Sequence, residues 1–136
     1  VPDFTLMDIH NHAVNLYSEI SPYTLLLFWH TQCSHCQSLM EALPQLCQKE
    51  IFTHQQIKLI GISIDENRED WEKFSIQYPL EWVNIHAAGS FDSEIATDYN
   101  LFATPSMFLI DENHKIIAKP TTIGELEKNI RELIEK

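Results

Sequence analysis

The chain has 136 residues, of which 44% are hydrophobic and 21% are charged. This length and composition predict one globular domain that spans residues 1–136. The formal net charge is −11, from 20 acidic and 9 basic residues. A surface of that sign repels phosphate backbones, which argues against nucleic acid as a partner. No apolar run approaches the roughly 20 residues that a membrane-spanning helix needs.

The first part of the sequence predicts a hairpin, a buried strand and a long helix. Residues 4–8 and 13–16 are short strand-like segments joined by a polar turn, which is typical of a β-hairpin. The apolar run 24–29 has the length of a buried strand. Apolar residues then recur at helical spacing, which predicts a helix from about residue 34 to residue 50. Pro44 inside this pattern predicts a kink, because proline removes a backbone donor and clashes with the preceding turn.

The rest of the chain alternates between predicted strands and helices. The aliphatic run 57–64 is typical of a central strand that is covered on both faces. The segments predicted after it are an amphipathic helix with Trp71, Phe74 and Tyr78 that ends before Pro79, a strand at 81–85, a helix at 92–99, a hairpin of strands 106–110 and 115–119, and a closing helix at 123–134. This order predicts an α/β fold with a central mixed sheet flanked by helices.

Two of the three cysteines stand at the predicted start of the first helix. Cys33 and Cys36 are separated by Ser34 and His35, and residues three apart on a helix are close enough for a disulfide. The unsatisfied amides at a helix start favour a thiolate, which is the species that attacks a disulfide. The motif therefore predicts thiol–disulfide exchange, with Cys33 as the nucleophile and Cys36 as the resolving cysteine.

The histidines divide into one inside the motif and several outside it. A protonated His35 imidazole, or its N–H, near the sulfurs would stabilise the thiolate and make the disulfide more oxidising. The alternative is that His35 faces solvent or a partner, but its position inside the motif favours tuning. The scattered His54, His86 and His114 are expected at the surface.

Two other uses of the cysteine pair stay open. A zinc half-site would need two further ligands. None of the seven histidines forms a second pair at ligand spacing, and the nearest candidates, His10 and His12, lie on a predicted turn. The two cysteines would alternatively be buried and inert, although their neighbours in the motif are polar. Cys47 lies on the apolar stripe of the predicted helix and is expected to be a small core residue.

With these features the chain resembles the thioredoxin superfamily, and in particular its TlpA/ResA-like membrane-tethered or periplasmic branch. The matching segments cover nearly the whole chain and comprise residues 2–6, residues 27–29 before the cysteines, the aliphatic run 59–65 and the segment 104–111. The resemblance implies a thioredoxin-like fold with an extra N-terminal β-hairpin. It also implies that Thr104 and Pro105 match the cis-proline segment, in which the residue before proline offers backbone groups to an extended substrate.

Further residues are expected to tune the cysteine pair or to contact the substrate, namely Ser34, His35, Trp29, Thr104 and Pro105. The chain also departs from the family pattern. Gln32 and His35 replace the usual tryptophan and proline of the motif. The buried acid of thioredoxins maps to Leu27, and the glutamate of the tethered branch maps near Leu39, with Glu41 as a loose substitute. These departures leave the proton acceptor of Cys36 and the direction of the reaction open.

The expected activity is disulfide exchange on protein substrates, with the chain as a reductant that an upstream electron donor recharges. No cofactor is expected. A peroxiredoxin-type peroxidase is one alternative, but that chemistry places a threonine three residues before its cysteine, and Thr31 stands two before Cys33. A non-catalytic binding domain with vestigial cysteines is another. A copper-delivery protein is disfavoured because those relatives use a Cys-x-x-x-Cys spacing.

The compartment is expected from the resemblance alone, and is periplasmic or otherwise extracytoplasmic. The chain opens at Val1 with neither an initiator methionine nor a signal peptide. We therefore expect a processed chain or a piece of a longer one, in which any membrane tether would lie outside residues 1–136.

Overall fold

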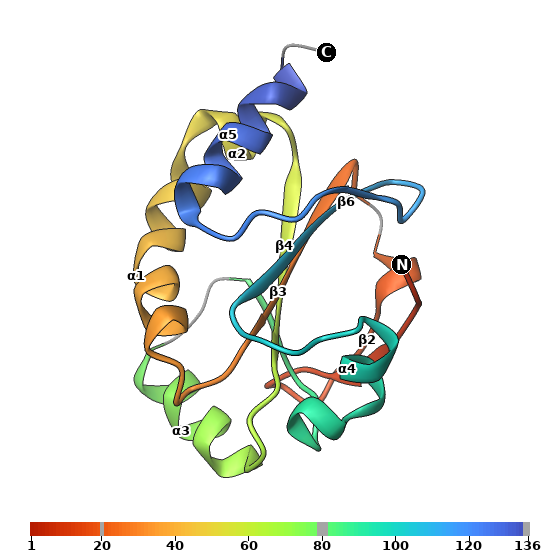
Figure 1. Ribbon diagram of the computed structural model, residues 1–136, viewed down its shortest axis with the longest axis vertical. Helices are drawn as coiled ribbons and strands as arrows, with labels where there is room; N and C mark the ends of the chain where they lie inside the picture. Colours follow the sequence, from red (N-terminus) through yellow and green to blue (C-terminus); the bar gives the residue numbers. More distant parts are fainter. Residues whose placement is uncertain (20, 79–81, 135–136) are drawn as a thin grey trace.

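The computed structural model describes residues 1–19, 21–78 and 82–134 (Figure 1). The strands are β1 (Thr5–Met7), β2 (Ala13–Asn15), β3 (Tyr23–Trp29), β4 (Ile57–Ser63), β5 (Val83–His86), β6 (Ser106–Asp111) and β7 (Ile116–Ala118). The helices are α1 (Ser34–Gln48), α2 (Glu50–His54), α3 (Arg68–Gln77), α4 (Glu94–Asp98) and α5 (Ile123–Ile134), with short 3₁₀ helices η1 (Leu16–Ser18) and η2 (Ser90–Asp92). The predicted α/β fold, with two hairpins around alternating strands and helices, is confirmed.

Five strands form the central sheet in the order β5-β4-β3-β6-β7. β3 is parallel to β4, and β4 is parallel to β5, whereas β6 is antiparallel to both β3 and β7. The register places Trp29 at the end of β3 opposite Ser63 at the end of β4. The carboxyl ends of these two parallel strands therefore meet at one edge, and the turn into α1 starts there.

Helices and the N-terminal hairpin cover the two faces of this sheet. Alternate residues of β3 serve the two sides: Leu25, Leu27 and Trp29 belong to one apolar cluster, and Leu26 and Phe28 belong to the other. Figure 1 shows α1, α2, α3 and α5 on the first side, and β2 and α4 on the second. Burial on both faces explains why β3 and β4 are nearly continuous aliphatic runs.

The N-terminal hairpin is attached to the edge of the sheet at β5. β1 and β2 pair antiparallel, as predicted. Asp8 forms a single antiparallel bridge with Ile85, and the Ile9 N–H donates to the Asn84 carbonyl at 3.0 Å. Leu16, directly after β2, is fully buried in the second cluster. The hairpin thereby shields backbone groups of an edge strand and closes one side of the core.

The first long helix contains Pro44 and is interrupted five residues after it. α1 continues through Pro44 to Gln48. The chain is extended at Lys49, with φ −71° and ψ 145°, and Glu50 then begins α2. The helix predicted for residues 34–50 therefore contains Pro44, as expected, and is broken at Lys49, where no break was expected.

The prediction that His86 lies at the surface is wrong. Its side chain is 8% exposed, its Nε2 donates to the Asp65 carbonyl at 2.7 Å, and its ring stacks on Trp71 with centroids 5.2 Å apart. Burial of an imidazole costs little when its polar atoms and its ring both have partners. His114 is half-buried at the β6–β7 turn, and the side chain of His54 lies outside the described ones.

The predicted helix stop before Pro79 is confirmed, whereas the strand start predicted at Glu81 lies outside the described residues. α3 ends at Gln77, and the Tyr78 N–H caps it by donating to the Phe74 carbonyl at 2.8 Å.

Candidate active site

Cys33 is the N-cap residue of α1, directly after the turn that leaves β3. Its backbone is extended, with φ −90° and ψ 113°. Its Sγ accepts a hydrogen bond from the Cys36 N–H at 3.1 Å, and its own N–H donates to the His30 carbonyl at 3.2 Å. A side chain at this position receives an amide hydrogen that has no partner inside the helix. An N–H donated to sulfur at a helix start favours the thiolate form.

Cys36 lies one turn into α1 and faces the apolar cluster beneath it. It is 1% exposed and shares the cluster with Leu27 and Leu39. Burial, followed by the hydrogen bond with Cys33, raises the pKa of the Cys36 thiol from its ordinary value of 9.0 to about 12. Cys33 is half-buried and both cysteines are free thiols. The pair therefore combines one accessible sulfur with one that stays protonated at neutral pH.

The loop before β6 brings Thr104 and Pro105 to the cysteines. The Thr104–Pro105 peptide bond is cis. The Cys33 thiol donates to the Thr104 carbonyl oxygen at 3.6 Å. Because β6 runs antiparallel to β3, with Ser106 opposite Phe28, the start of β6 and the end of β3 share one edge of the sheet. Residues far apart in the chain are thus brought together at Cys33.

The other residues of the predicted site take different places. Ser34 and His35 are exposed, and His35 lines a hollow together with Pro105. Among the described residues, His35 makes no hydrogen bond with either sulfur, which agrees with the alternative that it faces solvent or a partner. Trp29 is 1% exposed and packs against Phe74 with ring centroids 5.2 Å apart. Trp29 therefore belongs to the buried core next to the site and has almost no surface that a substrate could contact.

Phe102 is a site neighbour that the sequence reasoning missed. It stands two residues before Thr104, and its side chain is 87% exposed. A signal for it exists in the sequence, since Phe102 is an aromatic residue in a loop and belongs to no helical or alternating apolar pattern. An exposed aromatic ring in the loop that contacts the reactive sulfur through Thr104 offers apolar contact area to a bound polypeptide.

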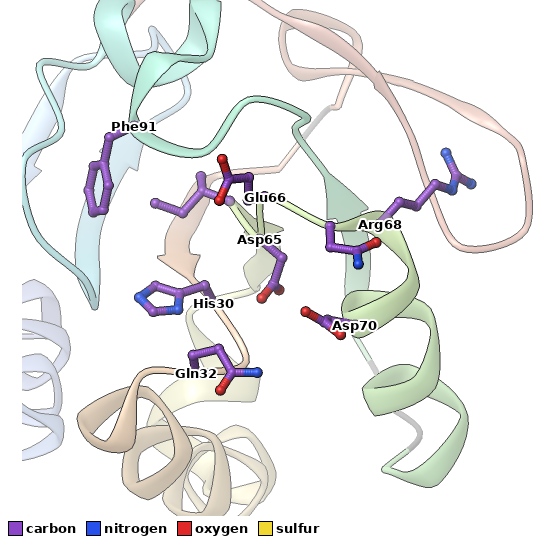
Figure 2. A pocket seen from close by; sticks show the side chains of 9 residues that line it. His30, Gln32, Asp65, Glu66, Arg68, Asp70 and Phe91 are labelled. Atoms are coloured by element: carbon purple, nitrogen blue, oxygen red, sulfur yellow. The ribbon is translucent and has the colours of Figure 1, made fainter.

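A hollow of about 620 Å³ lies beside the turn that carries Cys33 (Figure 2). His30 and Gln32 line it from the turn, Asp65 and Glu66 line it from the chain after β4, and Phe91 lines it from η2. Asp65 is not among the site residues predicted from the sequence. Its signal is a carboxylate that directly follows a buried aliphatic strand, at the edge where the turn into α1 begins.

The remaining candidates for metal or redox chemistry lie apart from this site. Cys47 is half-buried and packs against the apolar cluster under α1, as expected of a core residue. The rings of His10 and His12 are 6.3 Å apart on the β1–β2 turn. Within residues 1–19, 21–78 and 82–134, no group of three or more His, Cys, Asp and Glu side chains is arranged to hold a metal ion.

Comparison with known proteins places this geometry among redox proteins. A family model for thioredoxin-like proteins matches residues 22–116. The thiol-disulfide oxidoreductase ResA of Geobacillus kaustophilus is 25% identical over 135 residues, which are 97% of this chain and 75% of that protein. ResA of Bacillus thuringiensis subsp. konkukian is 26% identical over 136 residues, with the same coverage. A solved structure of a thiol-disulfide oxidoreductase from Bacteroides fragilis superposes with a TM-score of 0.85, at 26% identity and 97% coverage of each chain.

Proposed function

This chain belongs to the thioredoxin-like family, and on that premise we propose that it is a thiol–disulfide oxidoreductase whose reactive pair is Cys33 and Cys36. The observation that carries the proposal is the hydrogen bond from the Cys36 N–H to the Cys33 sulfur, 3.1 Å long, at the start of α1. It joins a sulfur whose anion is stabilised to a second thiol one turn away. The names of the related oxidoreductases support the same activity.

The reaction consists of two successive exchanges of sulfur bonds. The Cys33 thiolate attacks one sulfur of a substrate disulfide, so that a bond forms between Cys33 and the substrate and the other substrate sulfur leaves as a thiolate. Cys36 then loses its proton and attacks the Cys33 sulfur. The Cys33–Cys36 disulfide forms, and the first substrate sulfur leaves as a thiolate. The substrate gains two electrons, and an upstream dithiol donor must return two electrons to the protein.

Cys36 needs a proton acceptor for its step, because its pKa is about 12 in the dithiol form. Leu27 and Leu39 carry no acid, and Glu41 is exposed. The hydrogen bond and the charge of Cys33 contribute to the raised pKa of Cys36, after burial, and both end once Cys33 is bonded to the substrate. The substrate thiolate released in the first step is then the base that takes up the proton of Cys36.

The direction that we favour is reduction of the substrate. The Cys33 sulfur receives a backbone hydrogen bond from the Cys36 amide, and as a thiol it donates one to Thr104. A strong oxidant needs a more heavily stabilised thiolate, because stabilising the reduced form raises the reduction potential. His35, the residue expected to add that stabilisation, is exposed and makes no hydrogen bond with either sulfur.

We propose that the substrate contacts the surface around Cys33. The backbone groups of Thr104 would pair with an extended segment of the substrate, and Pro105, Ser34 and His35 would line its path. The exposure of Ser34 and His35, the partial exposure of Thr104 and Pro105, and the contact between Thr104 and Cys33 support this assignment. Substrates are therefore proteins with accessible disulfides rather than ligands of a closed pocket.

A peroxidase is disfavoured by the surroundings of Thr31. Its hydroxyl donates to the Asp65 carboxylate at 2.6 Å and is therefore directed away from Cys33. A peroxide-consumption assay with a recycling thiol system separates the two activities, since the oxidoreductase proposal expects consumption no faster than that of the recycling thiols alone.

We also propose an extracytoplasmic location, on the resemblance to the TlpA/ResA-like branch. The parts of the chain that the structure describes contain no helix with the length and apolarity to cross a bilayer. Fractionation of cells that express the full-length gene product tests this location, and recovery in the cytoplasm would overturn it.

The activity is tested by reduction of insulin disulfides with dithiothreitol as the electron source. The wild-type chain is expected to accelerate the reaction, and Cys33→Ala is expected to abolish the acceleration. Cys36→Ala should accumulate a mixed disulfide with the substrate, because the release step is missing. Cys47→Ala is the matched control and should retain the wild-type rate. Equal rates for wild type and Cys33→Ala would refute the proposal.

The direction is tested by titrating the Cys33–Cys36 pair against glutathione or dithiothreitol. A reduction potential of about −270 mV is expected of a reductant, whereas a value of about −120 mV would indicate an oxidant.

A further inference from the structure

Asp65 is a buried carboxylate two residues after the end of β4, at the edge of the sheet where the reactive turn begins. It is 4% exposed. Its Oδ1 accepts hydrogen bonds from the Thr31 backbone N–H at 2.9 Å and from the Thr31 hydroxyl at 2.6 Å. Its Oδ2 accepts one from the Ser63 hydroxyl at 2.5 Å. Figure 2 shows the Asp65 carboxylate pointing toward the turn that carries His30 and Gln32.

The Thr31 peptide is held from the opposite side as well. The Gln37 side-chain amide, on the second turn of α1, donates to the Thr31 carbonyl at 3.0 Å. The turn is closed within itself by the Cys33 N–H, which donates to the His30 carbonyl at 3.2 Å. The middle of the connection between β3 and α1 is thus tied to the sheet through Asp65 and to the helix through Gln37.

Asp65 is itself held in place by partners that do not touch the cysteines. Its N–H donates to the Ser63 hydroxyl at 3.1 Å, and its carbonyl accepts the Nε2–H of His86 at 2.7 Å. The His86 ring stacks on the fully buried Trp71. Asp65 is therefore tied to β4 through Ser63 and to β5 through His86, so that it links the turn to the sheet.

We propose that Asp65 is a positioning residue for Cys33: by binding the backbone N–H and the hydroxyl of Thr31, it fixes the turn that places the Cys33 sulfur against the Cys36 amide in the first turn of α1. The chemical role assigned to Cys33 rests on the proposed function, whereas the positioning is a property of the turn. Asp65 touches no reacting atom and acts only through Thr31.

Loss of the anchor has a defined consequence for Cys33. Without the carboxylate, the Thr31 N–H is buried without an acceptor, and the turn relaxes to satisfy it. The Cys33 sulfur then loses its alignment with the Cys36 amide, so its thiolate is less stabilised. Its reaction with an alkylating agent slows, and the Cys33–Cys36 couple becomes more reducing, because the reduced form loses stabilisation.

The test compares four variants in the full chain. Asp65→Ala removes every side-chain contact of the anchor. Asp65→Asn keeps an acceptor for Thr31 and can donate to Ser63, and Thr31→Val removes only the hydroxyl contact. Asp111→Ala is the matched control: the Asp111 carboxylate accepts from two backbone N–H groups, 2.8 and 3.0 Å away, in the β6–β7 turn. That turn lies at the far end of β3 from Cys33, where Asp111 is opposite Tyr23.

Two quantities are measured without any protein substrate: the rate at which Cys33 is alkylated by iodoacetamide at neutral pH, mapped by peptide mass, and the reduction potential of the pair. Asp65→Ala is expected to slow alkylation about tenfold and Thr31→Val about threefold, each with a more negative potential. Asp65→Asn should stay within about twofold of wild type, because the acceptor for Thr31 is kept. Asp111→Ala should lose stability and leave both quantities unchanged.

The inference is overturned if folded Asp65→Ala alkylates at the wild-type rate with the wild-type potential. If Asp65→Ala fails to fold, Thr31→Val decides by the same criterion. If the variants show these shifts but the wild-type chain does not reduce insulin, the proposed function is overturned and the positioning role stays intact.

Discussion

Cys33 and Cys36 carry the same thiol group in different surroundings. Cys33 caps the helix and receives an amide hydrogen on its sulfur, whereas Cys36 points into the apolar cluster and is 1% exposed. The first arrangement favours an anion, and the second disfavours one. Their order of action in the proposed reaction follows from this difference: burial raises the pKa of Cys36 and keeps that thiol protonated, so the more accessible Cys33 attacks first.

Phe102 offers a test of how the site meets a protein substrate. Replacement by serine is expected to lower kcat/KM for insulin roughly threefold to tenfold, because the ring can bury apolar area against the substrate beside Cys33. Most of the loss should lie in KM. The rate with hydroxyethyl disulfide should stay unchanged, since this small substrate reaches Cys33 without covering Phe102.

Ile76 supplies the control for Phe102. It is 77% exposed and lies on α3, so Ile76→Ser removes a similar exposed apolar side chain away from the loop before β6. The Ile76→Ser variant should behave as wild type with both substrates. Equal losses in the two variants would mean that Phe102 contributes only nonspecific apolar contact and makes no specific contact with the substrate.

Among single residues, those of the motif could be predicted from the sequence and those that act across the fold could not. Cys33 and Cys36 are close in the chain, and helix geometry alone brings them together. The contact of Thr31 with Asp65 joins residues 34 positions apart, and it depends on the register of β3 with β4. The burial of His86 depends in the same way on Trp71, which packs over it from another element.

At the scale of elements, strands and helices with strong apolar patterns were predicted closely. The aliphatic runs became β3 and β4 because both faces of these strands are covered, and the polar turns of both hairpins were recognised from their composition. The break at Lys49 was not predicted, since nothing local to Lys49 forbids a helix. Pro44 does not end α1, because a proline can remain inside a helix whose packing stabilises it.

Gly61 gives a prediction about β4. It sits under two indole rings, and a Cβ built on it would lie 2.8 Å from Nε1 of Trp82 and 3.5 Å from Nε1 of Trp29. Gly61→Ala is therefore expected to push the Trp82 ring away and to lower the free energy of unfolding by about 1–3 kcal/mol. Urea unfolding measures the loss, and the tryptophan emission of the folded state should shift, because the rings are repacked.

Gly124 is the matched control for Gly61. It lies in α5, and the nearest atom to a built Cβ is the Thr122 hydroxyl oxygen at 3.9 Å. Gly124→Ala should leave stability unchanged or raise it by up to about 1 kcal/mol, since alanine is the better helix former. A Gly61→Ala variant as stable as wild type, with unchanged emission, would show that the space between the two rings is not filled.

For the whole molecule, the sheet separates the site from the other half of the core. Cys36 belongs to the cluster between the sheet and α1, whereas Leu16 and the N-terminal hairpin belong to the cluster on the opposite face. The resolving cysteine is thus part of the core that holds α1 to the sheet. Its ionisation is consequently linked to the stability of the fold as well as to the reaction.

This link predicts how stability depends on pH. The pKa of Cys36 is about 12 in the folded dithiol form and near its ordinary 9.0 in the unfolded chain, so the unfolded state releases this proton first as the pH rises. The contribution of Cys36 to the free energy of unfolding is therefore fully present below pH about 9 and is lost progressively as the pH rises toward about 12. Burial also raises the pKa of Tyr99, and its effect has the same sign.

The contribution of Cys36 is isolated by comparing wild type with Cys36→Ala, which retains Tyr99. With thiols kept reduced by a phosphine, urea unfolding at about pH 8 is expected to show the variant less stable by about 1–2 kcal/mol, because a buried sulfur is lost. At about pH 10.5 the difference should shrink or reverse, since only the wild type must keep a buried thiol protonated against the solvent. A difference that stays constant over this range would mean that Cys36 titrates alike in the folded and unfolded chains, and that burial under α1 does not control it.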